Sequence, residues 1–220
     1  MEESDWSSDV CSSDLSYFLA IASLLTLPVA GVAQDVAPDV LIRNASNDVL
    51  EIVRKDKDIQ SGNLTKAIEL VEVKVLPHFN FMRMTQLAVG KDWRQATPEQ
   101  QQTLANEFRT LLVRTYSKAL SEYRNQVITF KPFVLKPEDK EVRVRTEVSQ
   151  ASGGKPIGID YYLEKSTNAW KVYDIEIAGV SLVTNYRESF GNEIRSNGID
   201  GLIKSLQAKN KANEGVAAKK

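Results

Sequence analysis

Few side chains in this sequence have the chemistry that catalysis needs. His78 is the only imidazole and Cys11 is the only thiol. A Ser/His or Cys/His nucleophile pair therefore has few partners to draw on, and a metal site built from several histidines or cysteines is excluded. His78 lies in a Leu-Pro-His-Phe segment, where a capping or surface role is a simpler interpretation than that of a catalytic base. The residue types alone argue against a hydrolase.

The acidic and glycine-containing motifs also have ordinary structural explanations. Asp174 and Glu176 alternate with apolar residues, so both carboxylates are expected on the solvated face of a strand. The Gly153-Gly154 pair separates two strand patterns and predicts a turn, not a phosphate cradle. The sequence has no G-x-S-x-G motif, P-loop or dinucleotide fingerprint. We therefore expect no cofactor, no metal and no catalytic residue.

The elements that must position any site fall into three blocks. Apolar residues recur at helical spacing within 37–55 and 63–76, and a short helix is expected over 79–89. Thr97, Pro98 and Gln100 form a capping-box signature that opens a long helix reaching about residue 124. C-terminal helices are expected over 180–207. Between these helical blocks the pattern changes to a period of two.

That middle block predicts an antiparallel sheet. Alternation runs through 142–148, 157–163 and 170–177, and a first strand over 127–135 contains Pro132, which favours a sheet edge. The order of helices, sheet and helices indicates an α+β fold. One face of the sheet is charged, so helices must cover the other, and an apolar cavity between sheet and helices is the expected ligand site.

The amino-terminal segment is typical of an export signal. Residues 17–33 (YFLAIASLLTLPVAGVA) are almost entirely apolar and end on small residues suited to signal-peptidase cleavage; an uncleaved anchor helix is the alternative. Residues 1–15 form an atypical acidic extension. Because all 28 basic residues and 24 of the 29 acidic residues follow residue 33, the body of the chain carries +4. No Lys/Arg cluster of nucleic-acid-binding density is present, so no nucleic acid partner is expected.

These patterns divide the chain into a signal peptide with its acidic extension (1–33), one domain (34–208) and a flexible tail (209–220). Within the domain we expect a helical part over 36–125, a sheet over 127–178 and C-terminal helices over 180–207.

Several segments together resemble the MlaC family of toluene-tolerance periplasmic proteins. The resemblance runs from about residue 36 to 207, in order and with similar spacing. It rests on residues 79–85 (FNFMRMT), 88–93 (AVGKDW), 96–100 (ATPEQ), 107–109 (EFR), 179–183 (GVSLV), 185–187 (NYR) and 198–202 (GIDGL). The acidic amino terminus departs from the family pattern.

The resemblance implies an exported periplasmic phospholipid carrier. It implies an NTF2-like, four-stranded antiparallel sheet with added helices, and acyl chains held between the two while the head group faces solvent. The expected partners are phospholipid, an inner-membrane ABC transporter complex and an outer-membrane lipoprotein–porin complex, whose exchange of lipid maintains outer-membrane asymmetry.

We expect acyl chains to contact apolar residues of the helices and of the sheet. Basic side chains at Arg83, Lys91 and Arg94 are expected to meet phosphate or a partner surface, or to be solvated charges. The predicted lipid contacts are Phe81, Met84, Leu87, Leu111, Leu112, Tyr116, Val144, Val148, Ile159, Tyr161, Val180, Val183 and Tyr186.

Two other hypotheses remain open at this level. An NTF2-like enzyme would act on a small apolar substrate with Asp160, Asp174 or Glu176 as base, and would need that carboxylate inside the cavity. A structural adaptor would instead have a filled interior with no room for an acyl chain.

Overall fold

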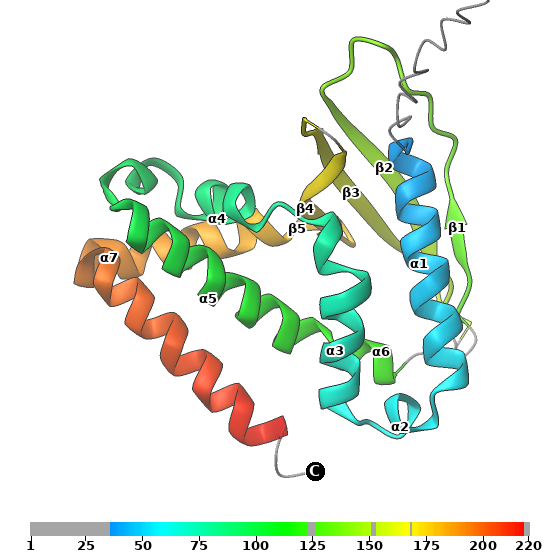
Figure 1. Cartoon of the computed structure of the whole chain (residues 1–220), viewed down its shortest axis with the longest axis horizontal. Coiled ribbons are helices and arrows are strands. Elements are labelled where there is room, and N and C mark those ends of the chain that lie inside the picture. Colours follow the sequence, from blue (N-terminus) through cyan, green and yellow to red (C-terminus); the bar gives the residue numbers. More distant parts are fainter. Residues whose placement is uncertain (1–35, 123–125, 151–152, 168, 218–220) are drawn as a thin grey trace, which may run out of the picture. The chain divides into compact units, whose positions relative to one another are not determined.

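The structure is a computed structural model that describes residues 36–122, 126–150, 153–167 and 169–217 (Figure 1). All of them belong to one compact unit that runs from Asp35 to Lys220. The expected signal peptide and its acidic extension lie outside the described residues. Within the described ranges, no helix combines the length and the apolar character that crossing a membrane requires.

Five antiparallel strands form a meander in which spatial order follows chain order. This confirms the predicted α+β class and antiparallel sheet, with a short fifth strand beyond the four expected. The first strand is only three residues long, shorter than the expected range of 127–135. It lies at the sheet edge, as expected from Pro132 in that range. The strands are β1 (Ile128–Phe130), β2 (Glu141–Val148), β3 (Ile157–Lys165), β4 (Trp170–Ile177) and β5 (Val180–Ser181).

The register gives the sheet two unlike faces. On the inner face, Val144 lies opposite Tyr161, which in turn lies opposite Ile175. On the outer face, Arg143 lies opposite Tyr162. A register shift between Tyr162 and Leu163 inserts one extra residue into β4. Because of this bulge, Val172 and Ile175 both reach the inner face although they are three residues apart.

The inner face is covered by helix α1 (Pro38–Lys55), which lies across the sheet (Figure 1). Ile42 packs from α1 into a cluster with Val144, Leu163, Trp170 and Val172. Helix α3 (Leu64–Lys74) runs beside α1 and leads into the 3-10 turn η1 (Leu76–His78). A second, separate cluster joins α1 to α3 and to the short helix α6 (Lys118–Ser121), and contains Val49, Val53, Ile59, Ala67, Leu70 and Leu120.

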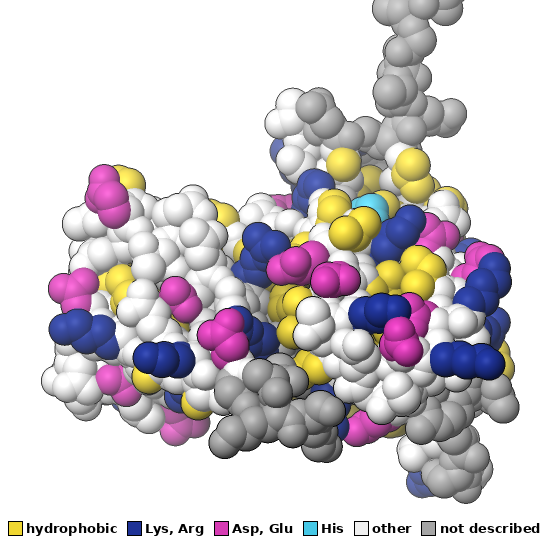
Figure 2. Space-filling model, turned by 60° about the horizontal axis from the view of Figure 1, so that its bottom comes forward, with side chains coloured by type: hydrophobic (Ala, Val, Ile, Leu, Met, Phe, Trp, Pro, Cys, Tyr) yellow, Lys and Arg dark blue, Asp and Glu magenta, His cyan; other side chains and the backbone are white. Residues whose placement is uncertain are grey.

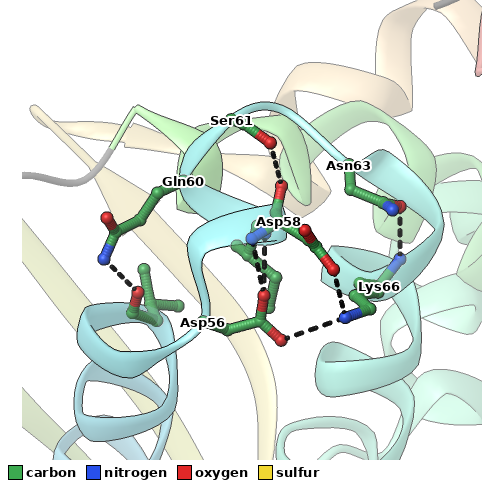
Figure 3. Close-up of polar contacts among 8 residues, drawn as sticks. Asp56, Asp58, Gln60, Ser61, Asn63 and Lys66 are labelled. Atoms are coloured by element: carbon green, nitrogen blue, oxygen red, sulfur yellow. Dashed lines mark hydrogen bonds and ion pairs between the residues drawn. The ribbon is translucent and has the colours of Figure 1, made fainter.

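Polar contacts fix the turn between α1 and α3 (Figure 3). Asp56 caps the short helix α2 (Lys57–Gln60) by accepting hydrogen bonds from the backbone N–H groups of Asp58 and Ile59 at 2.9 and 3.1 Å. Asn63 caps α3 in the same way, through the N–H of Lys66. The Lys66 ammonium also pairs with Asp58 at 2.5 Å and with Asp56 at 3.6 Å. These contacts connect the three helices, which together form the α1–α3 hairpin.

The other helices build their own core beside the sheet. Helix α5 (Pro98–Tyr116) starts at the predicted Thr97–Gln100 capping box. The ring of Phe108, fully buried, contacts those of Tyr186 and Phe190 edge-on at 5.0 and 5.1 Å. The remaining elements of this group are α4 (Phe81–Val89), η2 (Gly90–Gln95) and α7 (Leu182–Ala217).

Two helix boundaries differ from the prediction. The helix expected to reach residue 124 ends at Tyr116, and α6 follows it as a separate helical turn. Between them Leu120 N–H donates to the Ser117 carbonyl three residues back, a tighter turn than an α-helix makes. Residues 123 and 124 lie outside the described residues. The segment expected to be a flexible tail continues α7 as helix to Ala217. Asn210 is buried there, and its side-chain amide donates to the carbonyl and carboxylate oxygens of Glu107 at 2.9 and 2.7 Å.

Candidate functional site

An apolar cavity of about 250 Å³ lies between the inner face of the sheet and the α1–α3 hairpin. It is bounded by the two clusters that flank it, one against the sheet and one between α1, α3 and α6. The cavity is lined by Ile42, Ala45, Ser46, Val49, Leu50, Val75, His78, Phe79, Leu120, Ile128, Tyr161 and Ile175.

The cavity exists because α1 places small side chains opposite the centre of the sheet. Ile42 and Val49 are buried and lie one turn to either side of Ala45 and Ser46 on the same helical stripe. Ile42 packs against the sheet, and Val49 packs against the cluster between α1 and α3. The two small residues between them leave space in front of Tyr161. A regular stripe of large aliphatic residues would have filled this space.

Of the described residues that line the cavity, three carry polar side chains: Ser46, His78 and Tyr161. Burial raises the pKa of Tyr161, against the opposing effect of hydrogen bonds with Ser46 and Thr146. Burial, helped by the nearby Lys171 ammonium, lowers the pKa of His78. Both groups are therefore uncharged at neutral pH, and none of the described residues that line the cavity carries a formal charge.

A second hollow of about 370 Å³ adjoins the cavity, with Ala45 and His78 lining both. It includes exposed Val36 and Val73 and the Lys74–Asp48 pair, whose charged atoms are 3.7 Å apart. Figure 2 shows hydrophobic side chains gathered beside the histidine, with charged side chains around them. The cavity thus adjoins a surface that is apolar at its centre and charged at its border.

The structure divides the predicted lipid contacts between two places. Tyr161 lines the cavity, and Val144 lies on the same inner face. Val148 and Ile159 are half-buried on that face, whereas Val180 is exposed on β5. The helical members lie in or against the packed core around Phe108, except Tyr116, which is 38% exposed at the end of α5; they are Phe81, Met84, Leu87, Leu111, Leu112, Val183 and Tyr186. Lipid contact by these residues stays a prediction.

The carboxylates required by the enzyme hypothesis lie on the outer face of the sheet. Asp160 lies opposite Glu176 and is 3.7 Å from the Arg143 guanidinium. Glu176 accepts a hydrogen bond from the Tyr162 hydroxyl at 2.9 Å. Asp174 caps the start of α7 by accepting from the backbone N–H of Val183 at 3.1 Å and from the Ser181 hydroxyl at 2.6 Å. None of the three lines the cavity.

Arg83 ties α4 to that outer face. Its guanidinium pairs with Glu164 and, at 2.6 Å, with Glu141, and lies 4.0 Å from the centre of the Tyr173 ring. Burial and the Glu141 carboxylate raise the pKa of Tyr173 to about 12, so its hydroxyl stays protonated and donates to Glu141 at 3.1 Å. Among the described residues, no group of His, Cys, Asp and Glu could hold a metal ion.

The residues that line the cavity from α1 and η1 were not among the predicted contacts. Ala45 and Val49 fall within the apolar repeat expected over 37–55, and the sequence favours a capping or surface role for His78. One signal was available in the sequence: the adjacent small residues Ala45 and Ser46 interrupt an otherwise bulky stripe on the helix that covers the sheet.

Known proteins share both the sequence pattern and the fold. A family model described as "MlaC protein" matches residues 43–208. The chain is 26% identical over 177 residues to the intermembrane phospholipid transport system binding protein MlaC of Haemophilus influenzae, covering 79% of this chain and 82% of that protein. It is 34% identical over 108 residues to toluene tolerance protein ttg2D of Pseudomonas putida, covering 49% of each.

A solved structure agrees. A phospholipid-binding protein from Ralstonia solanacearum, in complex with a phospholipid, superimposes with a TM-score of 0.76 at 40% identity, covering 81% of this chain and 99% of the other.

Proposed function

The chain belongs to the MlaC family, and on that premise we propose that it is a periplasmic phospholipid carrier. It takes up acyl chains in the cavity between α1, α3 and the sheet, and leaves the head group outside. The observation that carries this proposal is the cavity in front of Tyr161, whose described lining residues are almost all apolar and carry no formal charge. Each CH₂ moved out of water contributes about 0.8 kcal/mol, so a plain apolar wall is sufficient to hold a lipid.

The size of the cavity makes a further demand on the protein. If a chain carbon occupies about as much space as a water molecule, roughly 30 Å³, then two acyl chains with about 30 carbons need about 900 Å³. The cavity has about 250 Å³. The cavity at this size therefore holds part of one chain. We propose that lipid uptake moves the α1–α3 hairpin away from the sheet, and that the adjoining hollow receives the chain segments nearest the head group.

The proposed partners follow from the family. The relative from Haemophilus influenzae is named as the binding protein of an intermembrane phospholipid transport system. We propose that this chain likewise exchanges lipid with an inner-membrane ABC transporter complex and an outer-membrane lipoprotein–porin complex, and so maintains outer-membrane asymmetry. Its relatives are named for phospholipid binding or transport, or for toluene tolerance. The enzyme hypothesis is not favoured, because its three carboxylates face away from the cavity.

The test is to recover the ligand. The protein is expressed in a Gram-negative host, collected from the periplasmic fraction and washed free of membranes. Organic extraction and mass spectrometry should find an equimolar amount of diacyl phospholipid. Folded protein that carries no lipid and takes none from vesicles would refute the carrier function, and recovery in the cytoplasmic fraction would refute the location.

A further inference from the structure

A second concave region lies away from the lipid cavity and is lined by cations. This basic groove, of about 570 Å³, is formed by α4, η2 and the first turns of α7. It shares no lining residue with the cavity. Its walls are Arg83, Gln86, Leu87, Gly90, Lys91, Trp93, Arg94 and Arg187.

Most of the charge in the groove is not neutralised by the residues that the structure describes. Arg83 is paired with Glu141 and Glu164. Lys91, Arg94 and Arg187 are exposed and have no ion pair with any part of the chain that the structure describes. The Nε–H of Arg187 donates to the carbonyl oxygen of Leu87 at 3.1 Å, which holds the side chain over α4 and leaves its terminal N–H groups available.

The groove also has an apolar floor. Trp93 is 7% exposed and belongs to the buried core around Phe108, and Leu87 packs against that core. The floor is therefore rigid, because it is one side of the main helical core. Cations around a rigid apolar floor suit a ligand that has both carboxylates and hydrophobic side chains.

These features discriminate between possible anionic ligands. A bilayer surface contacts protruding side chains, whereas these cations line a hollow. A lone phosphate needs several donors directed at one point, and the groove spreads its cations over three elements around apolar residues. We infer that the basic groove binds an acidic, amphipathic segment of a partner protein. The inference deepens the proposed function and rests on it, since a carrier must dock on the complexes with which it exchanges lipid.

The experiment measures binding of a fluorescein-labelled synthetic peptide that alternates glutamate and leucine, with a glutamine–leucine peptide as the neutral comparison. The double variant Lys91→Glu/Arg94→Glu should bind the acidic peptide about tenfold to a hundredfold more weakly than the wild type. The matched control, Lys209→Glu/Lys211→Glu, changes the net charge equally on exposed residues of the last turns of α7 and should bind normally. Wild-type binding should weaken as salt rises from about 0.05 M to about 0.5 M.

Three results would overturn the inference: equal weakening in both double variants, equal binding of the neutral peptide, or displacement of the acidic peptide by inorganic phosphate or by phosphatidylglycerol vesicles at matched charge. Lipid content is measured on the same samples. The groove variant should retain its phospholipid, because the groove and the cavity share no residue. Wild-type protein that binds the peptide but contains no lipid would refute the carrier function without contradicting the inference of a docking site.

Discussion

Substitution of Ala45 by phenylalanine should fill about half or more of the proposed lipid cavity without unfolding the protein. Ala45 lies on the stripe of α1 that faces the sheet and lines the cavity. The new ring would point into space that is already open, so it displaces ligand and not a packed side chain. The cost in helix propensity is small, at most about 0.7 kcal/mol.

The effect on lipid affinity follows from the volume. At roughly 30 Å³ per carbon, the cavity of about 250 Å³ holds about eight carbons of an acyl chain. A phenyl ring takes the place of about four to six of them. At ~0.8 kcal/mol for each CH₂ returned to water, the loss is about 3–5 kcal/mol. That corresponds to a dissociation constant raised roughly a hundredfold to several thousandfold.

The assay combines lipid counting with uptake. Phospholipid is extracted from the purified Ala45→Phe protein and counted by mass spectrometry, and delipidated protein is titrated with a fluorescent short-chain phospholipid. The matched control is Asn47→Phe, which puts the same ring on the same helix at an exposed position that lines neither hollow. The control should bind lipid as the wild type does, and both variants should unfold cooperatively.

Full lipid content in a folded Ala45→Phe protein would refute the reasoning, because it would place the acyl chains elsewhere. The core around Phe108, where most of the helical residues predicted from the sequence lie, would then become the better site. Equal losses in the two variants would show that the ring acts through α1 as a whole and not through the cavity.

Three further predictions concern stability. Asp56→Ala should lower the free energy of unfolding by about 1 kcal/mol, since it removes the cap of α2 (Figure 3), as measured by urea denaturation. The pKa of the His78 imidazole is lowered in the folded state, so the unfolded chain binds a proton there more readily. The free energy of unfolding should therefore fall as pH drops below about 6.5, and this decrease should be smaller in His78→Gln. Gly198 kinks α7 with a φ of 71°, so Gly198→Ala should destabilise by about 1 kcal/mol or more, whereas Gly191→Ala in regular helix should stabilise by up to about 1 kcal/mol.

Each of these has its own contrary outcome. An Asp58→Ala variant should lose less than Asp56→Ala, because it removes only an exposed ion pair; the reverse order would contradict the capping role. Identical pH profiles for the wild type and His78→Gln would show that other groups dominate acid sensitivity. Equal effects at Gly198 and Gly191 would mean that the kink is not a constraint.

Local patterns predicted most of the elements but not all of their ends. The alternation around Val144 and the capping box at Thr97 correspond to observed elements, because period-two burial and side-chain capping are local effects. The β4 bulge could not be predicted, since it depends on how two strands pair. Nor could the helix beyond Lys209, which is held by contacts between Asn210 and Glu107 that lie 103 residues apart.

The site was harder to predict than the fold for a related reason. An apolar stripe on a helix is the same pattern whether it packs solidly or leaves a void. The stripe of α5 packs solidly around Phe108, whereas the stripe of α1 leaves a void because Ala45 and Ser46 face Tyr161. Choosing between them requires knowing which helix faces the sheet, and that is a tertiary contact.

The separation of the cavity from the main helical core has an evolutionary consequence. The cluster around Phe108 contributes no residue to the cavity wall other than Phe79, which packs against its edge. Under the proposed function, mutations at Ala45, Ser46 or Val75 can therefore adjust the cavity to longer, shorter or branched acyl chains while leaving the main core unchanged. Adaptation to a different membrane composition, as when growth temperature changes the lipids, is thus open to single substitutions with little loss of stability.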